Sequence, residues 1–179
     1  LKGVPDVTVV ADIHYTSPSA CLNKKNIIIT GGGRGLGYAM AKKFVAEGAN
    51  VLISGRNESV LRDSAKEIGC QYLTLDVNDT NSFPFFISRA EELLGEIDCL
   101  VNNAGISLHE NSFLEVSPKQ FDSQFDTNLK GAFFLTQCFI ERSLKANRGN
   151  MKKILFTSSE TSMTVDERPY GLTKAAMNS

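Results

Sequence analysis

The sequence of 179 residues lacks the features that mark a membrane or nucleic-acid protein. It contains no run of 18 apolar residues, and its charged side chains form no block of one sign. A membrane span needs about 18 or more consecutive apolar residues, and clustered basic charge is typical of nucleic-acid or membrane-surface binding. The first residues also lack the basic start and apolar core of a secretory signal. We therefore expect a soluble, cytoplasmic protein that binds neither nucleic acid nor membrane.

Cysteine and histidine are few and scattered. The two histidines are isolated, and no C-x-x-C pair occurs among the four cysteines, which lie beside apolar residues at positions 21, 70, 99 and 138. This pattern is typical of buried free thiols rather than of disulfides or a zinc site. We expect no metal.

What the sequence does contain is a glycine-rich turn, TGGGRGLG at residues 30–37, between an apolar run and an amphipathic stretch that begins near Tyr38. The order predicts a strand, a turn and a helix. Glycines spaced Gly-x3-Gly-x-Gly let the backbone approach a ligand and aim helix N-terminal N–H groups at a pyrophosphate. Because ordinary tight turns also use glycine, and the commonest dinucleotide fingerprint is G-x-G-x-x-G, the turn alone is a weak signal.

From residue 22 onward, short β-rich runs alternate with helical stretches. This alternation indicates an α/β fold, a Rossmann-type doubly wound parallel sheet in three layers. We expect residues 22–179 to form one dinucleotide-binding domain and residues 1–21 to be an N-terminal extension, in which residues 6–12 alternate like a strand. Strands are predicted at 25–30, 50–55, 71–75, 97–102 and 152–158.

Two helices carry clear signals. The first should end before Gly48 and bury a face made of Leu36, Ala39, Met40 and Phe44. The second opens at a capping box, Ser117-Pro118-Lys119-Gln120, and runs through Asn128 towards Arg142.

Three further motifs follow the glycine turn in order: NNAG at residues 102–105, Asn128 in the long helix, and Y-x-x-x-K at residues 170–174 after a strand that ends in serines. Together the four motifs resemble the classical short-chain dehydrogenase/reductase family, over about residues 22–179. Members of that family continue with two further strands and substrate-covering helices. The resemblance therefore implies that the C-terminal strands are missing from this chain.

The cofactor preference follows from the end of the second predicted strand. NAD-selective proteins place an acidic residue there, but residues 51–57 contain none. Arg56 can instead bind a 2′-phosphate through bidentate charge-assisted contacts, and Arg34 adds a second positive charge in the family's geometry. The alternative is that both arginines are ordinary solvated surface residues. We predict NADP(H).

The resemblance assigns further cofactor contacts. Asp76 would bind the adenine amino group, although it is also a candidate helix-entry carboxylate in competition with Asp79 or Asn81. The segment 103–105 would line the cofactor, although it also suits a simple strand-end turn. The predicted cofactor-binding residues are Gly31, Gly33, Arg34, Gly35, Leu36, Gly37, Arg56, Asp76, Val77, Asn103, Ala104, Gly105, Tyr170 and Lys174.

Tyr170 and Lys174 are four residues apart, so on a helix they share one face. A nearby ammonium group stabilises a phenolate, which makes a tyrosine a better acid and base at neutral pH. By resemblance, Tyr170 would protonate the substrate oxygen, Lys174 would also hold the nicotinamide ribose, and Asn128 would extend a proton path through water beside a helix irregularity. On its own, a Y-x-x-x-K pair is as typical of an ordinary helix surface.

The remaining catalytic group is a serine. The family pattern selects Ser159, which lies 11 residues before Tyr170, slightly closer than is usual. Ser158 stays an alternative, and the two cannot both point at the substrate if the strand continues through them.

These residues predict an NADPH-dependent reductase that converts a carbonyl group of the ketone or 3-oxoacyl type to an alcohol, or catalyses the reverse reaction. We expect a small-molecule substrate and a homodimer or homotetramer. The alternative is a nucleotide-binding scaffold or an inactive fragment of such an enzyme, because a fold does not guarantee activity.

Overall fold

The computed structural model describes residues 21–146, 151–164 and 168–178. The strand expected at residues 6–12, and nearly all of the expected N-terminal extension, lie outside the described residues.

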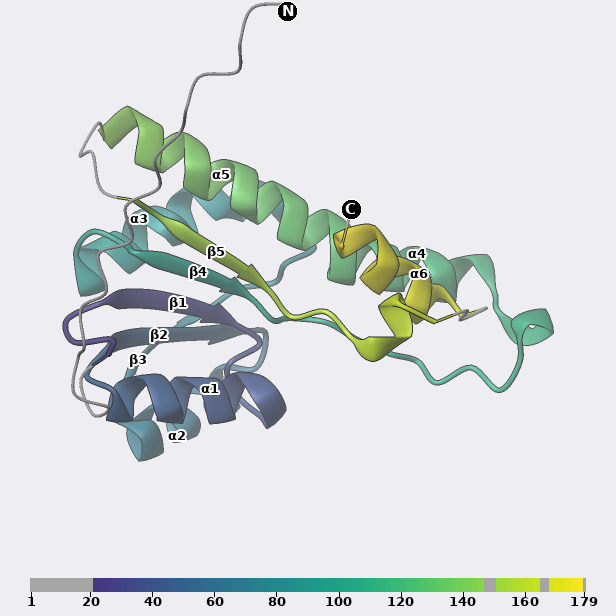
Figure 1. The fold of residues 1–179 in the computed structure, drawn as a ribbon, viewed down its shortest axis with the longest axis horizontal. Coiled ribbons are helices and arrows are strands. Elements are labelled where there is room, and N and C mark those ends of the chain that lie inside the picture. Colours follow the sequence, from purple (N-terminus) through teal and green to yellow (C-terminus); the bar gives the residue numbers. More distant parts are fainter. Residues whose placement is uncertain (1–20, 147–150, 165–167, 179) are drawn as a thin grey trace, which may run out of the picture.

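The core is a five-stranded parallel sheet with strand order β3-β2-β1-β4-β5 (Figure 1). The strands are β1 (Asn26–Thr30), β2 (Asn50–Gly55), β3 (Gln71–Thr74), β4 (Cys99–Asn102) and β5 (Lys153–Phe156). All five predicted strands and the doubly wound α/β class are confirmed. The predicted fifth strand is two residues too long at its C-terminal end, so both candidate serines follow β5 rather than belong to it.

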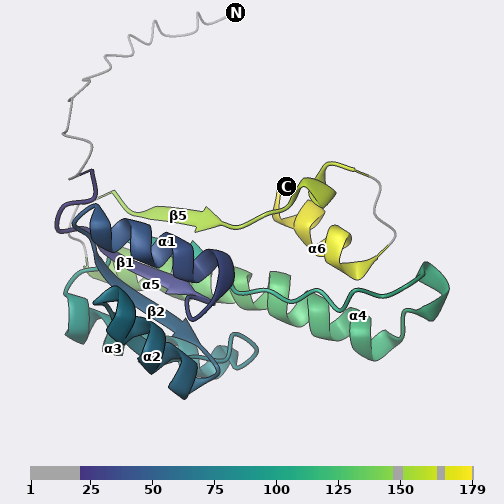
Figure 2. The ribbon, with the colours of Figure 1, turned by 90° about the horizontal axis from the view of Figure 1, so that it is seen from below.

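Helices cover both faces of the sheet and make three layers (Figures 1 and 2). One face packs against α1 (Gly35–Ala46) and α2 (Glu58–Ile68), and the other against α3 (Phe83–Leu94) and α5 (Gly131–Ala146). Successive side chains of β1 point to opposite faces of the sheet, and both faces are apolar. Ile28 packs in the core under α3 and α5, while Ile27 and Ile29 pack in the core under α1 and α2. The central strands are apolar throughout because both of their faces are buried.

The predicted buried face of α1 is wrong in part. Leu36 is 69% exposed and Ala39 is exposed, whereas the buried residues are Gly37 and Ala41. The cause is the close approach of α1 to the glycine turn, which admits only small residues at its nearest points. Met40 and Phe44 do pack against the core, and Gly48 follows the helix with φ +86°.

The long second helix is confirmed, with its capping box, but it has three parts. An α-helix, α4 (Pro118–Phe125), leads into a π-helical segment, Asp126–Lys130, and then into α5. The π-helical segment contains Asn128, where the family resemblance implies an irregularity. The last helix, α6 (Pro169–Met177), packs beside α4.

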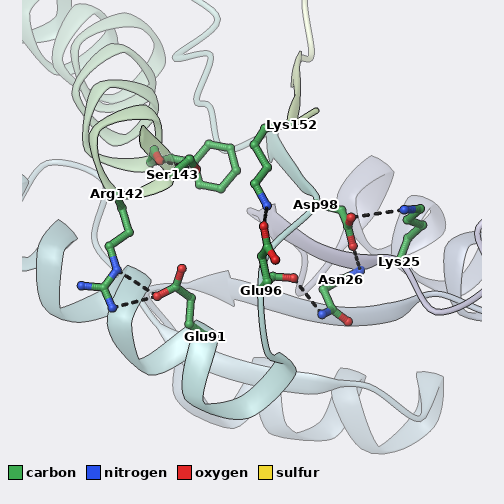
Figure 3. A network of polar contacts seen from close by, with 9 residues as sticks. Lys25, Asn26, Glu91, Glu96, Asp98, Arg142, Ser143 and Lys152 are labelled. Carbon is green, nitrogen blue, oxygen red and sulfur yellow. Dashed lines mark hydrogen bonds and ion pairs between the residues drawn. The ribbon is translucent and has the colours of Figure 1, made fainter. Parts of the chain in front are cut away.

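The N-terminal edge of the sheet is held by paired charges (Figure 3). The Asp98 carboxylate accepts from the Asn26 N–H at 2.9 Å and from Lys25 Nζ at 3.2 Å. Lys152, just before β5, pairs with Glu96, just before β4. These contacts fix where β1, β4 and β5 begin.

No helix within the described residues is long and apolar enough to cross a membrane.

All four cysteines are free thiols, and burial raises the pKa of Cys70 and of Cys99 to about 11. The expectation of burial is confirmed for Cys99 and only in part for Cys70 and Cys138, which are half-buried. It is wrong for Cys21, which is exposed and precedes β1.

Candidate functional site

The glycine turn connects β1 to α1 and has a conformation that few other residues allow. Gly31 and Gly35 have φ of +67° and +57°. A Cβ on Gly37 would lie 2.3 Å from the Gly31 carbonyl oxygen, and one on Gly31 would lie 2.9 Å from the Ala104 Cα. The backbone is therefore packed too closely for side chains at these points.

Side chains from the ends of β1 and β4 hold the turn in place. Asn103 Nδ2 donates to the carbonyl oxygens of Thr30 at 3.0 Å and of Gly31 at 3.2 Å. The Thr30 hydroxyl oxygen accepts from the backbone N–H groups of Asn103 and Ala104, both at 3.0 Å. The NNAG segment thus supports the glycine turn as well as following β4.

A cleft of about 530 Å³ opens at the C-terminal ends of β1, β2, β3 and β4, where open α/β sheets bind ligands. Ten of the predicted cofactor-binding residues line it: Gly31, Gly33, Arg34, Leu36, Arg56, Asp76, Val77, Asn103, Ala104 and Gly105. The other four, Gly35, Gly37, Tyr170 and Lys174, do not line it, and Gly37 is buried beneath the turn. Sequence reasoning missed lining residues such as Thr30, Ser54 and Asn57, for which the available signal is a polar residue at or just after a strand end.

The charges around the cleft are mostly positive. Arg34 and Arg56 are exposed side chains on its wall, and Asp76 is the one carboxylate among its lining residues. The Asp76 carboxylate accepts from the Asn78 N–H at 3.0 Å, so it also stabilises the turn after β3. The cleft can therefore accommodate an anionic ligand that has one neutral, hydrogen-bonding end.

Asn128 lies fully buried beside the cleft. Its Oδ1 accepts from the Ile106 N–H at 2.7 Å, and its Nδ2 donates to the Ile106 carbonyl at 2.9 Å and to the Thr173 hydroxyl at 3.1 Å. Asn128 thereby ties the π-helical segment to α6 and to the loop after β4.

Lys174 is only 4% exposed, and its Nζ donates to the Thr157 carbonyl oxygen at 2.6 Å. The same Nζ is 5.6 Å from the centroid of the Tyr170 ring, so the predicted shared helix face is present. A Cβ on Gly105 would lie 3.7 Å from Lys174 Nζ and 3.2 Å from Asn128 Oδ1, so these two side chains lie beside Gly105, a residue of the cleft wall. Burial lowers the pKa of Lys174 from its ordinary value.

The two serines have different partners. Ser159 Oγ accepts from the Thr161 N–H at 3.3 Å and from the Thr161 hydroxyl at 3.0 Å, at the start of a short 3₁₀ turn, Glu160–Ser162. The Ser158 hydroxyl instead donates to the Lys174 carbonyl at 3.4 Å. Both serines therefore lie beside α6, and the choice of Ser159 stays a prediction.

Comparison with known proteins gives this arrangement a family. The family model described as short chain dehydrogenase matches residues 25–179. The chain is 32% identical over 163 residues to the oxidoreductase UcpA of Salmonella typhimurium, covering 87% of this chain and 60% of that protein. It is 35% identical over 142 residues to an NADP-dependent (R)-specific alcohol dehydrogenase of Lentilactobacillus kefiri, covering 77% of this chain and 55% of that protein.

A third relative is short-chain dehydrogenase/reductase 3 of Bos taurus, 31% identical over 136 residues, covering 73% of this chain and 45% of that protein. The chain thus spans about 60% or less of the length of these relatives. The glycine turn, the NNAG segment, Asn128 and the Tyr170–Lys174 pair all lie within the matched residues. The chain belongs to the short-chain dehydrogenase/reductase family.

Proposed function

We propose that this protein is an NADPH-dependent oxidoreductase that reduces a carbonyl group of the ketone or 3-oxoacyl type to an alcohol, or catalyses the reverse reaction. The observation that carries the proposal is the buried ammonium group of Lys174, which lies beside the Tyr170 ring and next to Gly105 on the wall of a cleft that the glycine turn also lines. Membership of the family implies a nicotinamide cofactor, and the alternative of a nucleotide-binding scaffold gives no role to this pair.

The preference for NADP(H) rests on charge. Arg34 and Arg56 both line the cleft, and no carboxylate stands at the end of β2, where a free 2′-hydroxyl would be bound. A charged hydrogen bond contributes about 1.5–3 kcal/mol, so two arginines give a phosphate a clear advantage. The relative from Lentilactobacillus kefiri is NADP-dependent by name, which agrees with this preference.

In the proposed reaction, bound NADPH supplies the hydride that reduces the carbonyl carbon. The Tyr170 hydroxyl donates a proton to the carbonyl oxygen as negative charge develops there. Lys174, four residues along the same helix face, stabilises the resulting phenolate. Ser159 donates a hydrogen bond to the substrate oxygen and orients it, and the backbone beside Asn128 holds a water that returns the proton.

Titration of cofactor fluorescence tests the preference. The unmutated full-length protein should bind NADPH at least about tenfold more tightly than NADH, and Arg56→Asp should reverse that order. Arg62→Asp is the matched control, because Arg62 lies on α2 outside the cleft lining and the change in charge is identical. Equal affinities for both cofactors in the unmutated protein would contradict the proposal. A panel of carbonyl substrates then separates an enzyme from a scaffold, which would bind NADPH without turnover.

We also propose that the protein forms a homodimer or homotetramer through its long helix. A groove of about 410 Å³ runs along α5 and is lined by exposed apolar side chains, including Phe133 and Ile140. Monomeric proteins rarely leave such a surface uncovered. Light scattering on a chain of confirmed mass tests this, and a well-folded monomer would contradict it. A cytoplasmic location stays a prediction from the sequence.

A further inference from the structure

A chain of hydrogen bonds joins the glycine turn to Lys174, and Thr157 lies at its centre. The Thr157 carbonyl oxygen accepts from Lys174 Nζ at 2.6 Å, and the Thr157 hydroxyl donates to Asn103 Oδ1 at 3.3 Å. The Asn103 amide then donates to the Thr30 and Gly31 carbonyl oxygens. One residue after β5 therefore contacts both halves of the candidate site.

The position of Thr157 is fixed by the sheet itself. Its backbone N–H donates to the Asn102 carbonyl oxygen at 2.9 Å, which extends the pairing of β4 with β5 by one step. The sheet pairing thus fixes the position of the Thr157 carbonyl and hydroxyl groups relative to the end of β4. Because the backbone of Thr157 is held by the sheet, its hydroxyl has little freedom to move and can orient a neighbouring side chain.

The neighbour that it orients is Asn103. An amide presents an acceptor on one side and two donors on the other, so a donor at Oδ1 directs Nδ2 towards the carbonyl groups of the turn. Asn103 Nδ2 also lies only 2.6 Å from the point where Gly37 would carry a Cβ, so the amide occupies the space beneath the turn. A rotated amide would place its oxygen against carbonyl oxygens and move the turn.

We propose that Thr157 is a positioning residue, whose hydroxyl fixes Asn103 and through it the glycine turn for cofactor binding. The inference rests on the proposed cofactor-binding function. Thr157 acts through Asn103 and the backbone rather than by contact with the reacting atoms.

The first test is to remove the hydroxyl group while keeping the shape of the side chain. In the full-length protein, Thr157→Val should weaken NADPH binding about threefold to tenfold, which corresponds to about 0.7–1.4 kcal/mol. Thr157→Ala, a second hydroxyl deletion, should show at least the same loss, and Thr157→Ser should restore binding to within about twofold of the unmutated protein.

Thr136→Val is the matched control. The Thr136 hydroxyl oxygen accepts from Asn102 Nδ2 at 2.9 Å, so Thr136 also contacts the side-chain amide of an asparagine at the end of β4, with the hydrogen bond in the opposite direction. No contact of Thr136 reaches the glycine turn or Lys174 among the interactions of the described residues, and its removal should leave NADPH affinity unchanged. Thermal unfolding of every variant separates a general loss of stability from a loss of binding.

A double-mutant cycle gives the decisive result. If the hydroxyl acts through the amide, Thr157→Val should have no further effect on NADPH affinity in an Asn103→Ala background. Additive losses would overturn the inference, as would normal binding by both hydroxyl deletions. If the unmutated protein prefers NADH, the proposed NADPH preference is wrong. The role of Thr157 can still be tested, because the same double-mutant cycle can then be measured with NADH. Binding of neither cofactor by the unmutated protein would overturn both.

Discussion

The edge of the sheet where the strands begin (the N-terminal edge) and the edge where they end (the C-terminal edge) differ in how their charged side chains are paired. At the N-terminal edge, ion pairs join charged side chains, as in the Lys25–Asp98 and Lys152–Glu96 pairs (Figure 3). At the C-terminal edge Lys174 is buried, and its Nζ contacts a carbonyl oxygen and the sulfur of Met177 rather than a carboxylate within the described residues. One edge is held by ion pairs, and the other buries a positive charge that contacts a carbonyl oxygen.

The same contrast appears in the backbone. Glycines at positive φ occur at both edges, but the packing around them differs. At the C-terminal edge a Cβ on Gly31 or Gly37 would lie 2.9 or 2.3 Å from backbone atoms, whereas at the N-terminal edge a Cβ on Gly48 or Gly95 would lie no closer than 3.2 Å to any atom. Proteins break local rules chiefly where a ligand must be bound or activated. The comparison therefore predicts that mutations at the C-terminal edge change function, and that mutations at the N-terminal edge change stability.

The largest expected effect is at Tyr170. Tyr170→Phe removes the proton donor and should reduce turnover by about 10²- to 10⁴-fold, the usual contribution of general acid catalysis. NADPH affinity should hardly change, because the lost hydroxyl acts on the substrate. Steady-state kinetics on an active carbonyl substrate, together with a cofactor titration, measure both effects. Near-normal turnover would contradict the assignment of Tyr170.

The next effect is at the glycine turn. Gly37→Ala places a Cβ against the Gly31 carbonyl oxygen and Asn103 Nδ2, and should weaken NADPH binding about tenfold to a hundredfold. Gly69→Ala is the control, because Gly69 has φ +79° but no atom within 4 Å of its Cβ position. That control should lose about 1 kcal/mol of stability and no cofactor affinity. Equal cofactor binding by both variants would show that close packing at the turn is not needed.

The sequence predicted the frame of the molecule better than its site. Apolar runs and glycine turns are local signals, so all five strands, the capping box at Ser117 and the turn after β1 were predicted from them. The buried face of α1 was predicted only in part, because Gly37 is buried by its close approach to the Gly31 carbonyl oxygen, a contact that depends on the fold rather than on an apolar side chain. The positioning role of Thr157 could not be predicted either, because it depends on a contact with Asn103, 54 residues earlier in the chain.

At the N-terminal edge, Asp98→Ala should affect stability alone. It removes an acceptor for the Asn26 N–H and the partner of Lys25, and should lower the free energy of unfolding by about 1–2 kcal/mol. Asp63→Ala is the control, since the Asp63 side chain is 78% exposed and its pair with Arg62 contributes little. Denaturant unfolding and NADPH titration measure the two properties. A loss of cofactor affinity in Asp98→Ala would contradict the prediction that mutations at the N-terminal edge change stability alone.

The last prediction concerns the pH dependence of stability that follows from the buried charge of Lys174. Burial lowers its pKa in the folded protein, so the folded state binds fewer protons than the unfolded state between the folded pKa and the ordinary lysine pKa of 10.5. The cost of burying the ammonium is fully present below the folded pKa and is relieved as the pH rises through it. Lys174→Met has no such titration.

The free energy of unfolding of the unmutated protein, measured relative to that of Lys174→Met, should therefore increase as the pH is raised from 7 towards 10.5. A difference in packing shifts this comparison equally at every pH and leaves its slope unchanged. The hydrogen bond from Lys174 Nζ to the Thr157 carbonyl is part of the titration itself, because an ammonium donates more strongly than an amine. Lys152→Met at the opposite edge provides the contrast, because Lys152 is paired with Glu96. A Lys174→Met comparison that is flat across this pH range would show that the ammonium at the C-terminal edge is as well compensated as those at the N-terminal edge.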